Sequence, residues 1–258
     1  MAVTAVNAFA NFDDATTTIF TTASYAFQNN QLYTLAVQGD RTANPTISSV
    51  TGGGITWVEV TNEPFDTIAT PTFRTTVLRG LVTSGAATGA LTITTSGTAG
   101  GLVWSCDEWS GMDTTGTNGS GAIGNTAVNA TDSATALTAT LASVTSGNAS
   151  YGAFATSVGT GSAIVVGTGY TSLGSAISGS ELRSLLTEYK STGDTTPNVT
   201  FASAAAGGVA IEIKAAGAAG INVALVKLTL TESIEGTITY ATGIDRYQPK
   251  GQIGGDGV

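Results

Sequence analysis

Residues 31–38 read QLYTLAVQ, and this stretch has the pattern of side chains that decides the fold class. Successive side chains of a β-strand point to opposite faces, so a strand here would divide its residues into two sets. One face would carry Leu32, Thr34, Ala36 and Gln38, and the other Tyr33, Leu35 and Val37. The stretch therefore predicts a β-strand.

Similar short stretches recur along the chain, at a spacing of roughly 8–15 residues that is typical of sandwiches and barrels. They are TISSV (46–50), ITWVEV (55–60), TFRTTVLRGLV (72–82), ALTITT (90–95), GLVWSCDEW (101–109), TALTATL (135–141), SYGAFAT (150–156), AIVVG (163–167), VTFAS (199–203) and GVAIEIKAA (208–216). The segments GDRTANP (39–45), GGG (52–54) and NEPFDTIATP (62–71) are predicted to be loops or turns. We expect an all-β protein whose residues 1–216 form one domain, an antiparallel β-sandwich of the jelly-roll or immunoglobulin-like kind that starts at about residue 15.

One segment, SGSELRSLLTEYK (178–190), fits two structures. Leu182, Leu185, Leu186 and Tyr189 have the spacing of a helical stripe, and Ser178 with Glu181 could form a capping box. Alternatively LLTEYK pairs with PNVTFAS across the STGDTT turn. We favour a strand over 184–190 because its surroundings are β.

Residues 217–258 are expected to form a separate C-terminal β-arm with a Gly-rich tail. INVALVKLTL (221–230) and GTITYATG (236–243) alternate as two strands of a hairpin. An isolated hairpin is marginal in water, so the arm must pack on something. The side chains predicted to contact a partner are Leu225, Leu228, Leu230, Ile238, Tyr240, Arg246 and Tyr247. The alternative is that the hairpin folds back and extends the chain's own sheet.

The composition excludes several classes of function. The chain has 258 residues, no His, one Cys, and 9 Lys+Arg against 18 Asp+Glu, which gives a net charge of -9. Without His there is no imidazole for a catalytic triad or for most zinc sites, and the negative charge argues against a nucleic-acid partner. The N-terminal MAVTAVNAFANFDD lacks the basic and apolar regions of a Sec signal peptide, and no stretch approaches the ~18 apolar residues of a membrane span.

Four stretches together resemble a known type of module: GGGITWVEV (52–60), TFRTTVLRGLV (72–82), VWSCDEWSGMDTTGTNGSGAIG (103–124) and LLTEYKSTGDTTPNVTFASAAAGGVAIEIKAA (185–216). They are similar to a β-sandwich module of bacteriophage structural proteins, including head decoration and accessory proteins, and of large bacterial surface proteins. The resemblance covers about residues 30–216. It implies a binding or structural module and assigns no functional residue.

The densest group of chemically active residues is WSCDEWSGMD (104–113). A carboxylate pair beside aromatic rings is what a glycosidase uses, but Asp107 and Glu108 are adjacent and would point to opposite faces of a strand. We therefore predict a structural strand with Trp104 and Cys106 facing inward, and no enzyme activity. Trp57 and Trp109 could instead form a platform that stacks on a glycan, although Trp in a β-protein more often belongs to the core.

The loop DTTGTNGSG (113–121) has oxygen donors at alternate positions, as a calcium loop does. Calcium usually takes several carboxylates, and Asp113 is the only one in this loop. A turn is therefore predicted, and neither a metal nor a cofactor is expected.

Two functions remain as expectations. The first is a non-enzymatic structural protein of a virus particle, assembled in the host cytoplasm. It would be a bacteriophage capsid decoration or accessory protein that docks, as a homo-oligomer, on the major capsid protein or another virion protein. The second is a carbohydrate-binding or adhesive module on a tail fibre or cell surface, whose partner is a host-surface glycan.

Overall fold

The structure, a computed structural model, describes residues 2–40, 45–67, 71–157, 163–179 and 183–217. Within these ranges the chain forms β-strands and one short 3-10 helix, which confirms the predicted all-β class. The strands are β1 Thr4–Asp13, β2 Thr17–Thr21, β3 Tyr25–Ala26, β4 Gln31–Asp40, β5 Ile47–Thr51, β6 Val58–Phe65, β7 Phe73–Val82, β8 Thr88–Gly89, β9 Thr92–Ala99, β10 Leu102–Ser110, β11 Ile123–Thr138, β12 Ala149–Thr156, β13 Val165–Val166, β14 Thr171–Ile177, β15 Ser184–Lys190 and β16 Asn198–Ile213, and the helix is η1 Thr117–Ala122.

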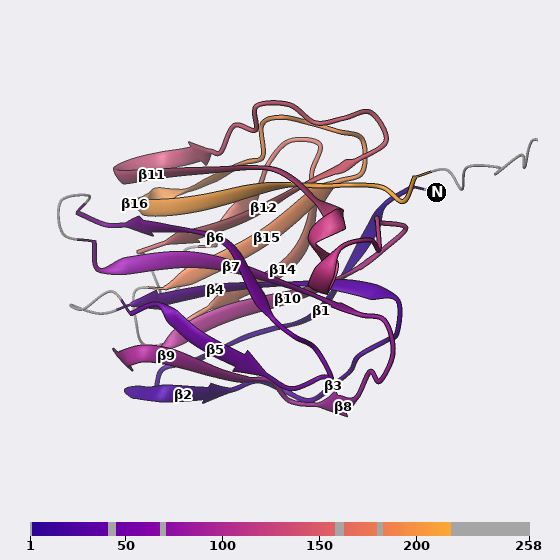
Figure 1. The fold of residues 1–258 in the computed structure, drawn as a ribbon. Helices are drawn as coiled ribbons and strands as arrows, with labels where there is room; N and C mark the ends of the chain where they lie inside the picture. The colour runs from indigo at the N-terminus through magenta and orange to yellow at the C-terminus, as the bar shows by residue number, and fades with distance from the viewer. Residues whose placement is uncertain (1, 41–44, 68–70, 158–162, 180–182, 218–258) are drawn as a thin grey trace, which may run out of the picture. The chain divides into compact units, whose positions relative to one another are not determined.

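Antiparallel pairing groups these strands into layers. A five-stranded sheet has the order β1-β10-β4-β7-β6, and a six-stranded sheet has the path β11-β16-β12-β15-β14 with β13 beside β16. A three-stranded sheet, β2-β9-β5, and the small pair β3-β8 complete the set. Figure 1 shows the five-stranded sheet between the six-stranded and three-stranded sheets, so this sandwich has a covered middle layer.

The middle sheet is apolar on both faces because it is covered on both. Leu32 and Ala36 of β4 pack with Val209 and other residues of the six-stranded sheet in one core. Leu35 of β4 packs in a second core with Ile93 of the three-stranded sheet. The alternation of QLYTLAVQ was therefore predicted correctly, and both of its faces are interior.

A third apolar cluster lies on the other face of the six-stranded sheet, where Phe154 and Leu186 meet Leu141, Ile164 and Phe201. The cover is made by β11 and β16 themselves, which bend back. Asn129 Nδ2 donates to the Thr138 carbonyl at 2.8 Å although nine positions of the same strand separate them. A straight strand would hold these residues roughly 30 Å apart.

Three local predictions were wrong. The predicted sandwich started at about residue 15, but β1, at residues 4–13, forms an edge of the middle sheet. Residues 62–65 were predicted to be a loop because of Pro64, but they end β6, an edge strand that tolerates a missing N–H. Residues 55–57 were predicted to begin a strand, but they lie outside β6 and follow the turn at Gly52–Gly54, whose φ angles are all positive.

The helix-or-strand alternative for 178–190 is settled over its second half. Residues 184–190 are β15, a strand, as we favoured. The predicted pairing of LLTEYK with PNVTFAS was wrong, because β15 pairs with β12 and β14, and β12 lies between β15 and β16. Residues 180–182, which include part of the helical stripe, lie outside the described ranges.

Gly207 of β16 lies where two layers approach each other closely. A side chain at this position would run into the ring of Phe65, which is fully buried and stacks on Phe73 with centroids 5.5 Å apart. We predict that Gly207→Val lowers the free energy of unfolding by about 1–3 kcal/mol, the usual cost of overpacking. Urea denaturation measures the change.

Gly97→Val is the matched control, because a Cβ at Gly97 of β9 meets no atom within 4 Å. Its stability should stay close to that of the wild type. Equal loss in both variants would contradict the packing account.

Candidate functional site

The segment WSCDEWSGMD lies on β10, a strand paired on both sides, with β1 and with β4. Double pairing keeps the strand extended, so its side chains alternate strictly. Asp107 faces the six-stranded sheet and contacts Tyr151 of β12, whereas Glu108 faces the other way and contacts Tyr33 of β4. The prediction that the two carboxyls do not share one site is confirmed.

Asp107 is fully buried, and its carboxyl oxygens accept hydrogen bonds from residues of three strands, β1, β10 and β12. Its Oδ1 accepts hydrogen bonds from Asn7 Nδ2 at 2.8 Å and Ser105 Oγ at 3.3 Å, and its Oδ2 accepts one from Tyr151 OH at 3.2 Å. Ser105 Oγ also bonds Thr187 Oγ1 of β15 at 3.1 Å. The cluster therefore ties the two large sheets together.

Burial raises the pKa of Asp107 to about 6, and the hydrogen bonds from Asn7, Thr187, Tyr151 and Ser105 oppose that rise. A raised carboxyl pKa is a mark of catalytic acids. A glycosidase acid must also reach the scissile bond, and Asp107 is closed off from solvent. Its geometry supports a structural role.

Glu108 is held by two tyrosines. Tyr25 OH and Tyr33 OH both donate to Glu108 Oε2 at 2.8 Å. Burial raises the pKa of Tyr25 to about 12 and that of Tyr33 further still, with hydrogen bonds to Glu108 adding to both shifts. Both phenols therefore stay protonated and act as donors to the carboxylate.

Cys106 directly precedes these two acids in the sequence. It is fully buried, as predicted for a small apolar side chain. Burial raises the pKa of its thiol well above the ordinary value, and the charges of Asp107 and Glu108 raise it further. Because the thiolate is the nucleophile, these surroundings keep Cys106 unreactive.

Sequence analysis missed two further buried carboxyls, Glu188 of β15 and Glu212 of β16. Glu188 accepts from the backbone N–H groups of Gly167 at 2.8 Å and Asn198 at 3.0 Å. Glu212 accepts from the backbone N–H groups of Asn125 and Thr145 and from the Asn148 amide. Each is a lone acid in a buried strand, which is a signal the sequence did offer.

The pKa values of these two acids move in opposite directions. Burial raises the pKa of Glu188 to about 7, partly offset by its two backbone donors. The pKa of Glu212 is lowered, because its four hydrogen bonds from Thr145, Asn125 and Asn148 together outweigh its burial. Both carboxyls anchor loops to the six-stranded sheet.

The two tryptophans proposed for glycan stacking have different surroundings. Trp109 is fully buried, donates from Nε1 to Thr34 Oγ1 at 2.9 Å and packs edge-on against Tyr151. A glycan cannot reach this ring, so Trp109 is not part of a stacking platform. Trp57 is half-buried and lines an open hollow of ≈ 350 Å³ with Val50, Thr51, Gly52, Gly54, Ile55 and Thr56.

The loop at 113–121 was predicted to be a turn, and most of it forms the 3-10 helix η1, which was not predicted. Asp113 Oδ1 accepts from the Thr115 N–H at 2.8 Å, and this bond holds the pKa of Asp113 below its usual value. Asn118 and Gly119 have positive φ, and Gly119 lies against Leu32 of the core. In the part of the chain that the structure describes, no group of three or more Cys, Asp or Glu side chains could hold a metal ion.

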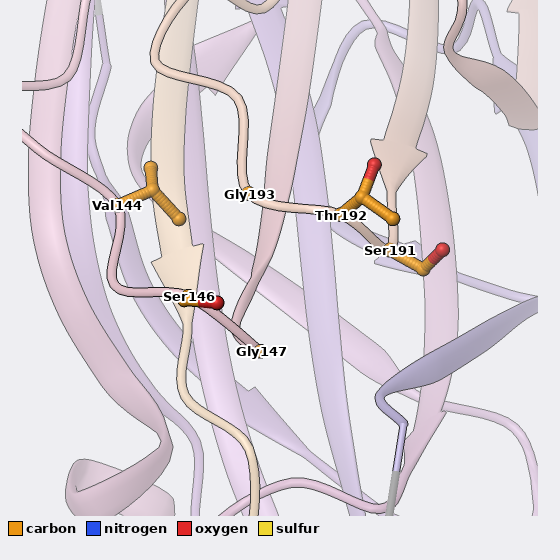
Figure 2. Close-up of a pocket in the computed structure, with 6 residues that line it drawn as sticks. All are labelled: Val144, Ser146, Gly147, Ser191, Thr192 and Gly193. Atoms are coloured by element: carbon orange, nitrogen blue, oxygen red, sulfur yellow. The ribbon is translucent and has the colours of Figure 1, made fainter.

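A second open hollow, of ≈ 410 Å³, lies between two loops. Figure 2 shows Val144, Ser146 and Gly147 on one side and Ser191, Thr192 and Gly193 on the other. All six side chains are small and none is charged, so this hollow offers only hydroxyl groups and backbone to a ligand.

The seven partner-contact residues of the predicted arm, Leu225, Leu228, Leu230, Ile238, Tyr240, Arg246 and Tyr247, lie outside the described residues. Among the described residues, no helix has the length and apolar character needed to cross a membrane. Comparisons of the chain with protein-family models, with curated proteins and with solved structures give no match.

The raised pKa values of Asp107 and Glu188 predict that the protein is less stable at pH 8 than at pH 5. Between about pH 4 and pH 7 the native state binds more protons than the unfolded state, so the free energy of unfolding falls as pH rises. Below about pH 4 the free energy of unfolding rises with pH, because the native pKa of Asp194, about 2, and that of Glu212 are lower than their ordinary values. Urea denaturation across this range should show a maximum near pH 4, where the rising and falling limbs meet.

Glu188→Gln removes one of the two titrating groups and should flatten the slope between about pH 4 and pH 7. Glu212→Gln is the contrasting variant, and it should leave that slope in place. A slope unchanged by Glu188→Gln would refute the assignment of the titration to this carboxyl.

Proposed function

We propose that this chain is a non-enzymatic structural protein of a virus particle, a bacteriophage capsid decoration or accessory protein that docks on the capsid lattice. Its partner would be the major capsid protein or another virion protein. It would act in the virion as a homo-oligomer after assembly in the host cytoplasm. The resemblance of residues 30–216 to modules of phage structural proteins supports this proposal.

The observation that carries the proposal is that the buried acidic side chains form hydrogen bonds within the fold. Asp107, Glu188 and Glu212 are each spent on hydrogen bonds that join strands or loops of the same fold. Side chains that elsewhere perform acid–base chemistry here hold layers together. This arrangement suits a structural protein, because these three acids strengthen the fold and are closed off from a substrate.

Mass spectrometry of purified virus particles from the source culture tests the proposal. We expect the protein at a fixed copy number relative to the major capsid protein, unchanged by a high-salt wash and density-gradient repurification. Absence from the particles, or an amount that falls with each purification step as host contaminants do, would rule the proposal out.

Truncation after Gly217 tests the predicted docking role of the arm. We expect the truncated chain to keep a β-type circular dichroism spectrum, because the described strands end at Ile213, and to lose attachment to the particle. A folded truncated chain that joins the particle at normal occupancy would show that the arm is not the docking element.

One observation favours a second function, a carbohydrate-binding or adhesive module, and that is the open hollow beside Trp57. An aromatic face with hydroxyl neighbours such as Thr51 and Thr56 suits a sugar ring. In that case a glycan array should show binding that Trp57→Ala abolishes and Trp57→Phe retains in part. Identical binding by Trp57→Ala would remove this hollow from consideration.

A further inference from the structure

A third hollow, of ≈ 230 Å³, lies at an edge of the middle sheet. It is lined by Thr4, Ala5, Val6, Gln31, Glu108, Trp109 and Ser110. The edge strand β1 forms one side, and there Val6, which pairs with Glu108 across the strands, is 57% exposed. An apolar side chain of this exposure beside a carboxylate distinguishes this hollow from the other two.

Glu108 uses only one of its two oxygens inside the fold. Both tyrosine hydroxyls donate to Oε2, and Oε1 accepts no hydrogen bond from any described residue. The described residues also place no Lys or Arg in an ion pair with this carboxylate. A carboxyl group that two tyrosines hold in a fixed orientation, with one oxygen unbonded, therefore lines the hollow.

The other polar groups of the hollow are also acceptors or neutral. Gln31 Oε1 is buried and receives no hydrogen bond within the described part of the chain. The hydroxyls of Thr4 and Ser110 bond each other at 2.7 Å. A site with one carboxyl group, neutral polar neighbours and no described cation favours a cationic hydrogen-bond donor over an anion.

The size and the apolar wall limit what that donor can be. A Lys or Arg side chain has a charged head on an aliphatic stem, and such side chains lay the stem along apolar surface. Val6 offers that surface next to Glu108. We propose that this hollow, the Glu108 socket, is a docking point for a Lys or Arg side chain of a different protein on which this chain assembles. The choice of partner rests on the proposed function.

The test uses the wild-type chain and small cationic probes followed by NMR. Ethylguanidinium and N-acetyl-lysine methylamide should shift the amide signals of Thr4, Val6 and Ser110 in a saturable way, and the uncharged N-acetyl-norleucine methylamide should not. Added salt should weaken the effect, because the attraction is electrostatic. Glu108→Gln, of nearly the same shape, should weaken probe binding at least tenfold.

Glu59→Gln is the matched control, because Glu59 is an exposed glutamate of β6 that accepts a bond from Asn62. It removes the same charge elsewhere and should bind the probes as the wild type does. Val6→Lys is the second variant, which leaves the tyrosine bonds of Glu108 intact. Its own ammonium should occupy the socket and block the probes even if Glu108→Gln folds poorly.

Probe-induced shifts of equal size in Glu108→Gln and the wild type would refute the proposal that the Glu108 socket binds a cationic side chain. Probe binding that persists in Val6→Lys would refute it as well. Self-association of the wild type that Glu108→Gln abolishes, measured by sedimentation, would place the basic side chain on a second copy and overturn its assignment to a different protein. Probe binding does not depend on a particle, so absence from virions and absence of a socket give separate results.

Discussion

The structure depends on the three central strands of the middle sheet having no face in contact with water. Strands β4, β7 and β10 are buried almost along their whole length. Most polar side chains on them find a partner inside the protein, since an unpaired buried group costs about 1–3 kcal/mol. Exceptions among the described residues are Gln38 Oε1, Arg79 Nη1 and Trp104 Nε1. This cost explains why the polar residues of these strands are mostly Thr, Ser and Gln, whose groups can be satisfied by one or two bonds.

Those partners come from the neighbouring layer, so the polar residues also align the sheets. Gln38 Nε2 donates to the Thr156 carbonyl at 2.9 Å, and Thr75 Oγ1 donates to the Gly207 carbonyl at 3.1 Å. Asp107 joins the same interface through Tyr151. Apolar contacts are non-directional, whereas these bonds hold one sheet in a specific position against the other.

Local patterns in the sequence predicted local structure well. The two faces of 31–38 and the opposed side chains of Asp107 and Glu108 followed from alternation, and the strand at 184–190 followed from its β surroundings. What surrounds a strand was not predictable in this way: alternation does not tell whether both faces are covered, so Trp109 could be mistaken for an exposed ring. Pro64 misled for a similar reason, because a proline is harmless in a strand only at an edge, and position within a sheet is a tertiary property.

The same limit applies to the candidate sites. Sequence reasoning could find WSCDEW because its active groups are neighbours in the chain, but the donors that define each carboxyl come from far away: Asn7 for Asp107, Tyr25 and Tyr33 for Glu108, Gly167 and Asn198 for Glu188. Those donors separate the acids into two kinds. Asp107, Glu188 and Glu212 use both carboxylate oxygens within the fold. Neutralising any of them should therefore change the free energy of unfolding. Glu108 has one oxygen without a partner in the described part of the fold. Neutralising Glu108 should therefore change the affinity for a partner, and we expect that partner to bind at the surface beside β1.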